Sequence, residues 1–310
     1  MLSRRSTLAL ASVLTAGLAL GACGGGDDTS SPAASSSSDA GGLSIVASTN
    51  VWGSVASSIA GDDATVTSII DDPSADPHSY EANTRTQLEL SKATVVVENG
   101  GGYDDFVDTM LAAASSNATV LNAVDISGKE ASAGEELNEH VWYDVETVRE
   151  VAREIETTLA EAAPDDAATF EANLKTFERG LDTLEQKIEE DKASTEGKAV
   201  AITEPVPGYL LEALGTENET PEEFSEAIEE ESDVPVDVLQ QTLALFSGHQ
   251  VQALVYNEQT TGPQTQEVLD AAKSNGVAVV PVTETLPEGE DYTTWMTGNV
   301  DAITAALTQQ

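Results

Sequence analysis

The sequence is poor in cysteine, histidine and basic charge. Cys23 is the only cysteine among 310 residues, so no disulfide can form within the chain. There are 3 histidines, and 13 lysines and arginines stand against 55 aspartates and glutamates, which gives a formal net charge of −42. Nucleic-acid binding needs a basic footprint, and anionic lipid repels an acidic surface. The composition therefore argues against both partners for the folded part of the chain.

Long apolar runs are also missing. The uncharged apolar stretch at 7–20 is shorter than the roughly 20 residues that span a membrane as a helix. It follows Arg4 and Arg5 and ends in small residues, an arrangement typical of a secretory signal peptide. We therefore expect residues 1–22 to be a signal peptide. Because Ser3-Arg4-Arg5-Ser6 partly resembles a twin-arginine signal, export by the Sec or the twin-arginine route stays open.

Cys23 ends a short motif at the expected cleavage point. Leu20-Gly21-Ala22-Cys23 resembles a bacterial lipobox, which implies cleavage before Cys23 and a diacylglycerol on its thiol. The alternative is a chance cysteine in an ordinary signal peptide. The following residues, 24–42, are mainly Gly, Ser, Ala and Asp and cannot bury enough surface to fold. We expect 23–42 to be a lipidated cysteine and a flexible tether, which anchors an extracytoplasmic protein to the outer face of the cell membrane.

From Leu43 onward, short apolar runs alternate with helical stretches. This alternation predicts an α/β fold with mostly parallel sheets. In the N-terminal lobe, 43–144, strands are predicted at 43–48, 65–70, 94–97 and 119–124, and helices at 51–60, 84–92 and 103–114. In the C-terminal lobe, 195–310, strands are predicted at 198–202, 251–256 and 277–282, and helices at 205–214, 236–246, 263–274 and 292–307. We therefore expect two lobes, each with a mostly parallel sheet and flanking helices.

The interval between the lobes, 145–194, has a helical pattern. Apolar residues spaced by 4 and 3 form one helix face: Phe170, Leu174, Phe177, Leu181, Leu184 and Ile188. Pro164 lacks a backbone N–H, so it predicts a break or kink near Ala163. The pattern predicts a long kinked linking helix or two helices in series, and a helical hairpin within one domain is the alternative.

Two histidines and two glutamates lie beyond the ends of predicted strands. The histidines are found in Asp76-Pro77-His78-Ser79-Tyr80-Glu81 and in Asn138-Glu139-His140-Val141-Trp142-Tyr143-Asp144. Glu204 follows the strand at 198–202, and Glu284 follows the strand at 277–282. Loops at the carboxyl ends of strands are the usual ligand positions in α/β folds. The four side chains can therefore point into one crevice between the lobes.

Both histidine motifs resemble those of the zinc/manganese solute-binding protein family of ABC transporters. The resemblance covers the chain from about Leu43 to its end and implies two α/β lobes joined by one long helix. It also implies four metal ligands: His78, His140, Glu204 and Glu284. Glu284 departs from the usual aspartate of the family by one methylene. The implied partners are the permease and the ATPase of an ABC importer, and we expect the protein to be a monomer.

The expected cargo is Zn²⁺ or Mn²⁺. Carboxylates suit a harder ion such as manganese, whereas the general order of affinities favours zinc, so the choice stays open. Asn138, Asp144 and Asn257 lie near the motifs and are candidates for orienting the ligands. The third histidine, His249, is predicted to be a surface turn residue.

Two other classes of function remain as alternatives. A metal-dependent hydrolase needs an open coordination position and a separate general base, and the sequence has no nucleophile elbow or phosphate loop. A cell-surface adhesin needs a protein-binding patch, which no sequence feature marks. We therefore expect a binding protein without enzymatic activity.

Overall fold

A computed structural model of the chain describes residues 42–75, 77–131 and 136–308. The expected signal peptide, Cys23 and nearly all of the expected tether lie outside the described residues. The first sheet contains β1 (Leu43–Thr49), β2 (Ala64–Ile70), β3 (Val95–Glu98) and β4 (Thr119–Asn122). These strands are all parallel, and their spatial order is β2-β1-β3-β4.

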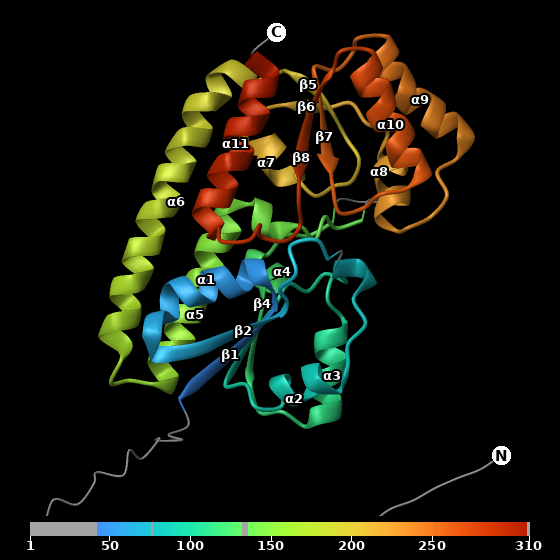
Figure 1. The fold of residues 1–310 in the computed structure, drawn as a ribbon. Helices are drawn as coiled ribbons and strands as arrows, with labels where there is room; N and C mark the ends of the chain where they lie inside the picture. The colour runs from blue at the N-terminus through green and yellow to red at the C-terminus, as the bar shows by residue number, and fades with distance from the viewer. Residues whose placement is uncertain (1–41, 76, 132–135, 309–310) are drawn as a thin grey trace, which may run out of the picture. The chain divides into compact units, whose positions relative to one another are not determined.

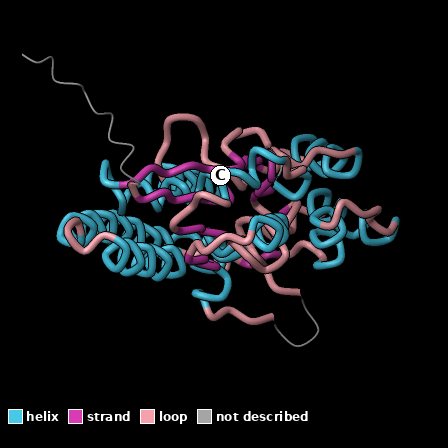
Figure 2. Tube along the Cα trace, turned by 90° about the horizontal axis from the view of Figure 1, so that it is seen from below, coloured by secondary structure: helices cyan, strands magenta, loops and turns pink. Residues whose placement is uncertain are grey.

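A second sheet repeats this arrangement. It contains β5 (Ala199–Ile202), β6 (Glu217–Asn218), β7 (Ala253–Asn257) and β8 (Ala278–Val282). These strands are also parallel, in the order β6-β5-β7-β8. Figure 1 shows the two sheets in separate lobes, and the tube in Figure 2 shows helices on the faces of both. The predicted fold class, two α/β lobes with parallel sheets, is confirmed.

Helices cover both faces of the first sheet, as parallel sheets require. They are α1 (Asn50–Ala60), α2 (Thr84–Leu90), α3 (Phe106–Ala114) and the short α4 (Ala123–Ser127). Ile45 and Ala47 of β1 pack in one apolar cluster with α1, whereas Val46 packs on the other face with Leu90 and Val107. The strand expected to run to Val124 instead ends at Asn122. The side chain of Asn122 accepts a hydrogen bond from the backbone N–H of Asp125 and so caps the N-terminus of α4.

The second sheet is covered in the same way. Its helices are α7 (Gly208–Ala213), α8 (Glu222–Glu229), α9 (Val236–Ser247), α10 (Pro263–Ser274) and α11 (Tyr292–Thr308). Neither α8 nor β6 was expected from the sequence. Both residues of β6 are exposed, so the strand has no apolar pattern, and α8 lies in a strongly acidic segment.

Two helices occupy the interval 145–194, which settles one choice that the sequence left open. They are α5 (Val145–Ala162) and α6 (Ala167–Thr195), with Pro164 in the break between them. The chain reverses direction at this break. Ion pairs between the two helices show the reversal: Arg153 of α5 pairs with Glu178 of α6, and Arg149 of α5 pairs with Asp182 of α6. The two helices therefore form a hairpin, and α6 alone runs from one lobe to the other (Figure 1).

One apolar cluster continues through both lobes. It includes Val97 from the first sheet, Leu184 from α6 and Val255 from the second sheet. By their internal contacts the described residues, from 42 onward, form one compact unit. A shared core resists rotation of one lobe against the other, because rotation would expose apolar surface. The lobe boundaries stay a prediction.

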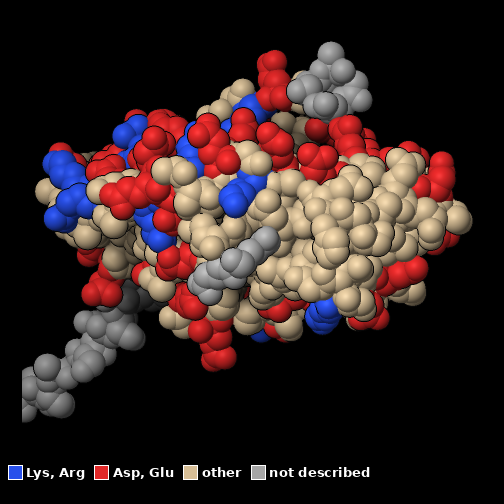
Figure 3. Space-filling model, turned by 90° about the horizontal axis from the view of Figure 1, so that it is seen from above, with Lys and Arg blue, Asp and Glu red and all other residues tan. Residues whose placement is uncertain are grey.

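The described surface is acidic. Figure 3 shows aspartate and glutamate side chains over the left part and along the rim of the face seen from above, with basic side chains in a few places and a broad area of uncharged residues on the right. Among the described residues, no helix combines the length and the apolar character needed to cross a membrane.

Replacement of Arg149 tests how much the ion pairs between α5 and α6 stabilise the hairpin. Its side chain is 8% exposed and contacts Glu146, Asp182 and Glu185 at 3.3, 3.1 and 2.8 Å. We expect Arg149→Ala to lower the free energy of unfolding by about 1–3 kcal/mol, because three carboxylates would lose their shared cation. The control is Arg153→Ala. Because the Arg153 side chain is 46% exposed, we expect this replacement to lower the free energy of unfolding by less than about 1 kcal/mol. Urea unfolding of the metal-free protein measures both, and equal losses would contradict the expectation.

Candidate metal centre

The carboxyl ends of the two sheets face each other where the lobes meet (Figure 1). In the first sheet the chain passes from the edge strand β2 to β3, on the other side of β1. In the second sheet it passes in the same way from β6 to β7, on the other side of β5. The strand order therefore reverses between β1 and β3 and between β5 and β7. Ligands bind at such switch points, because neighbouring loops diverge there. His78 lies in a single 3-10 turn (Pro77–Ser79) after β2, and His140 precedes another (Val141–Tyr143) after α4.

Three of the four expected ligands converge at this place. The Nε2 atom of His78 lies 3.5 Å from Oε2 of Glu284, and Nε2 of His140 lies 4.0 Å from the same oxygen. One ligand atom from each of the three residues lies within 4.8 Å of those of the other two, which is the geometry of a metal-binding group. His140 and Glu284 are fully buried, and His78 is half-buried.

Glu204 lies beside this group rather than within it. It is 2% exposed, and its Oε2 atom has no hydrogen-bond partner among the described residues. Burial, followed by the negative charges of Glu229 and Glu284, raises its pKa to about 9. Hydrogen bonds from Asn257 and Thr260 oppose this rise. Its carboxyl group is therefore close enough to the other carboxylates to feel their charge.

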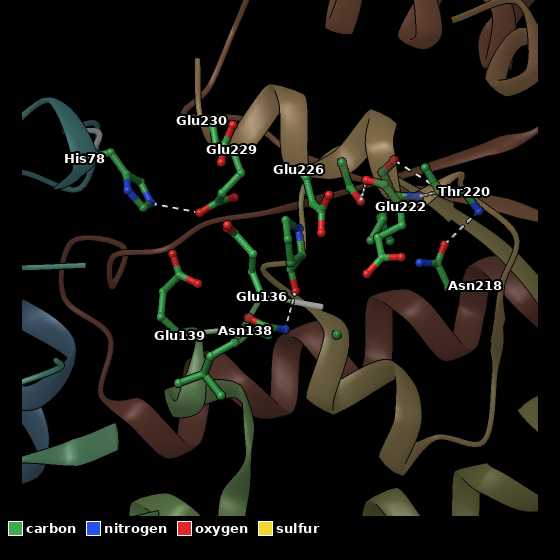
Figure 4. Close-up of a pocket in the computed structure, with 15 residues that line it drawn as sticks. His78, Glu136, Asn138, Glu139, Asn218, Thr220, Glu222, Glu226, Glu229 and Glu230 are labelled. Carbon is green, nitrogen blue, oxygen red and sulfur yellow. Dashed lines mark hydrogen bonds and ion pairs between the residues drawn. The ribbon is translucent and has the colours of Figure 1, made fainter. Parts of the chain in front are cut away.

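Sequence reasoning missed Glu229, which stands at the C-terminal end of α8. Its Oε1 atom lies 3.0 Å from Nε2 of His78 and 3.4 Å from Nε2 of His140. Glu139 joins His78 and Glu229 in a second group of possible ligands. In Figure 4 the carboxylate of Glu229 points toward the His78 ring, with Glu139 nearby. The available signal was the spacing of Phe224, Ala227 and Ile228, which predicts an amphipathic helix ending at Glu229.

The imidazoles and carboxylates at the centre shift one another's pKa values. Burial opposes protonation of His78, but hydrogen bonds and charges from Glu229 and Glu284 outweigh it and raise the pKa of His78 to about 11. Burial also opposes ionisation of Glu284, yet its hydrogen bond with His78 and the nearby imidazoles hold its pKa below the usual value. The centre therefore favours a cation among its carboxylates.

Asn138 and Asn257 contact the expected ligands directly. Oδ1 of Asn138 lies 2.8 Å from Nδ1 of His140, which leaves Nε2 directed at the carboxylates. Nδ2 of Asn257 donates to Oε1 of Glu284 at 2.9 Å. Within the described part of the chain, Asp144 does not contact an expected ligand. It pairs with Lys129 at 2.9 Å and accepts a hydrogen bond from Thr147.

Tyr103 links the two lobes at the centre. Its hydroxyl donates to Oε2 of Glu284 at 3.1 Å, and its ring meets the His78 ring edge to face at 5.0 Å. Residues 103–105 were expected to be helical, but α3 begins at Phe106. Three glycines in succession, 100–102, have φ values of 77, 70 and 98°, so they turn the chain after β3 and deliver Tyr103 to the centre.

Gln259 also joins the lobes. Its Nε2 atom donates to the carbonyl of Ala75 at 2.6 Å and to Oγ1 of Thr285 at 2.8 Å. Its Oε1 atom accepts from the backbone N–H of Glu284. One side chain thus fixes the loop that carries His78 to the loop that carries Glu284.

A cavity of about 510 Å³ leads from the surface to His78. Its lining includes six glutamates, all labelled in Figure 4: Glu136, Glu139, Glu222, Glu226, Glu229 and Glu230. Burial and the charges of neighbouring glutamates raise the pKa of Glu226. The entrance therefore attracts cations, and the imidazoles and carboxylates at its end suit a divalent transition metal.

His249 has no part in this centre. It is exposed at the turn that follows α9, and its φ of 50° belongs to a tight turn. The expectation of a surface turn residue agrees with this position.

Known proteins share both sequence and fold with this chain. The manganese-binding lipoprotein MntA of Halalkalibacterium halodurans is 30% identical over 180 residues, which cover 57% of this chain and 59% of that protein. The manganese ABC transporter substrate-binding lipoprotein ScaA of Streptococcus gordonii is 27% identical over 60% of this chain and 67% of its own length. The structure of the periplasmic zinc-binding protein TroA of Treponema pallidum matches 86% of this chain and 99% of its own, with 19% identity and a TM-score of 0.73.

A family profile covers most of the chain. The profile of the ZnuA family, described as the periplasmic component A of a zinc-uptake complex, matches residues 45–306. This range includes both sheets, α6 and every residue placed at the centre. The chain belongs to the ZnuA family of metal-uptake binding proteins.

Proposed function

We propose that this protein captures a divalent transition metal ion, Zn²⁺ or Mn²⁺, between its two lobes and delivers it to an ABC importer. The observation that carries the proposal is the convergence of His78, His140 and Glu284 at the facing carboxyl ends of two parallel sheets. Membership of the ZnuA family and the curated relatives, named for metal binding and ABC transport, support the same function.

The proposed ligands are His78, His140, Glu284 and Glu204. Neutral imidazole and carboxylate are ordinary ligands for both ions. The metal would take the place of the proton on His78, because a protonated imidazole cannot bind it. Glu204 would turn its unpaired Oε2 atom toward the ion, since a divalent cation would offset the repulsion from the other carboxylates.

The remaining parts of the proposal concern where the protein acts and with which partners. Lipidation of Cys23 would hold it at the outer face of the cell membrane, with 24–42 as the tether. The permease of the importer would receive the ion, and its ATPase would drive transport. The binding protein itself would act as a monomer. A hydrolase is not favoured, because the ZnuA family supplies the binding component of an uptake complex.

Single replacements test the ligand set. We expect His78→Ala, His140→Ala and Glu284→Gln each to weaken Zn²⁺ and Mn²⁺ binding by more than about 100-fold, a larger loss than supporting groups cause. Glu204→Gln should weaken it as well, since the amide cannot supply a charged oxygen. Competition titration with a chelator on the detergent-solubilised full-length protein measures the affinities. His249→Ala is the control, and unchanged binding by His140→Ala would contradict the proposed site.

Asn138 provides a second test, because it orients His140 without binding metal. We expect Asn138→Ala to weaken metal binding by about 10–100-fold while the protein stays folded. Asp144→Asn is the comparison, since Asp144 pairs with Lys129 rather than with a ligand. The same titration, with circular dichroism as the check on folding, distinguishes them. Equal losses in both variants would refute the orienting role of Asn138.

A further inference from the structure

Glu229 lies nearer to both imidazoles than Glu284 does. Its Oε1 atom is 3.0 and 3.4 Å from the Nε2 atoms of His78 and His140, against 3.5 and 4.0 Å for Oε2 of Glu284. The carboxylate therefore already occupies a position from which it can share an ion with both rings.

The second oxygen of Glu229 is buried without compensation. The side chain is 12% exposed, and Oε2 has no hydrogen-bond partner among the described residues. A buried carboxylate oxygen in this state costs free energy unless a cation lies beside it. An ion pair with His78 accounts for Oε1 alone, so a larger positive charge fits this carboxylate better.

The position of Glu229 on its helix is also unfavourable for folding. It is the last residue of α8, where the partial negative charge of the helix dipole opposes a carboxylate. Phe224 and Ile228 hold α8 in the apolar cluster of the C-terminal lobe, which fixes the direction of the helix end. The fold therefore presents this carboxylate to the centre from a packed element, at some cost in stability.

We propose that Glu229 is a direct ligand of the transported metal, in addition to the four residues proposed above. This inference rests on the proposed metal capture and extends it. Two imidazoles and three carboxylates give at least five donor atoms. Zinc sites in proteins are usually four-coordinate, whereas an oxygen-rich site with more ligands suits Mn²⁺. Glu229 thus determines specificity, and it favours Mn²⁺ over Zn²⁺.

Glu229→Gln tests the proposal with little change in shape. We expect Mn²⁺ affinity to fall by at least about 10-fold and Zn²⁺ affinity to fall less, because zinc can keep four ligands. X-ray absorption of the bound Mn²⁺ should show fewer nearest oxygen and nitrogen neighbours than in the wild type. Glu223→Gln is the matched control, since it makes the same change on an exposed face of α8 and should alter neither quantity.

The coordination number separates a ligand from a structural residue. If Glu229 were only part of a structural ion pair, its loss would weaken the binding of both metals alike and leave the number of metal neighbours unchanged, which would overturn the proposal.

If Glu229→Gln does not fold, Glu229→Asp is the second variant, because it keeps the charge but shortens the side chain by one methylene. It should again weaken Mn²⁺ more than Zn²⁺, and equal losses would overturn the proposal. Wild-type protein that binds neither ion would refute the proposed function, whereas tight binding that is unchanged in Glu229→Gln would refute this inference alone.

Discussion

Mutual repulsion among buried carboxylates constrains the whole centre. Glu229 and Glu284 approach the same point between the lobes and Glu204 lies beside them, where water cannot screen their charges well. Near neutral pH, the proton held by His78 and the proton that the raised pKa of Glu204 keeps on its carboxyl offset part of this repulsion. A divalent ion would place two positive charges beside the ionised carboxylates and would release both protons. The energy stored by forcing the carboxylates together is therefore released when the metal binds, and the fold must be firm enough to keep them together in its absence.

Firmness comes from contacts that cross between the lobes. Gln259 joins the loop before His78 to the loop of Glu284, and Asn138 joins His140 to the carbonyl of Pro205. Tyr143 donates to the carbonyl of Thr283 at 2.7 Å. Together with the apolar cluster that passes through α6, these bonds make a wide rotation of the lobes costly. Local movement of ligand loops or of α8 disturbs fewer of these contacts, so release of the ion is better served by such movement than by separation of the lobes.

Most of the fold could be predicted from the sequence, whereas the centre could be predicted only in part. Buried strands such as β3 and β7 are continuous apolar runs, and Pro164 marked the break between α5 and α6. His78, His140 and Glu284 stood out because they lie beyond predicted strands and because both histidine motifs resemble those of a known metal-binding family. Glu229 did not, because it lies in an acidic run whose members look alike in sequence, and only packing of Phe224 and Ile228 decides which one points inward. Contacts such as that of Gln259 with Ala75 join residues 184 positions apart, which no local pattern reveals.

The acidic surface and the inner centre have different effects on the same ion. Glutamates at the entrance raise the local concentration of any cation, but exposed charges act over only about 8 Å at physiological salt and do not discriminate between metals. Discrimination requires fixed donor atoms, and Asn138, Asn257 and Tyr103 hold two of the proposed ligands, His140 and Glu284, in place. Most of the net charge of −42 therefore contributes nothing to the choice between metals. The selective part of the molecule reduces to a few buried or half-buried side chains, two of them imidazoles, whose positions depend on both sheets at once.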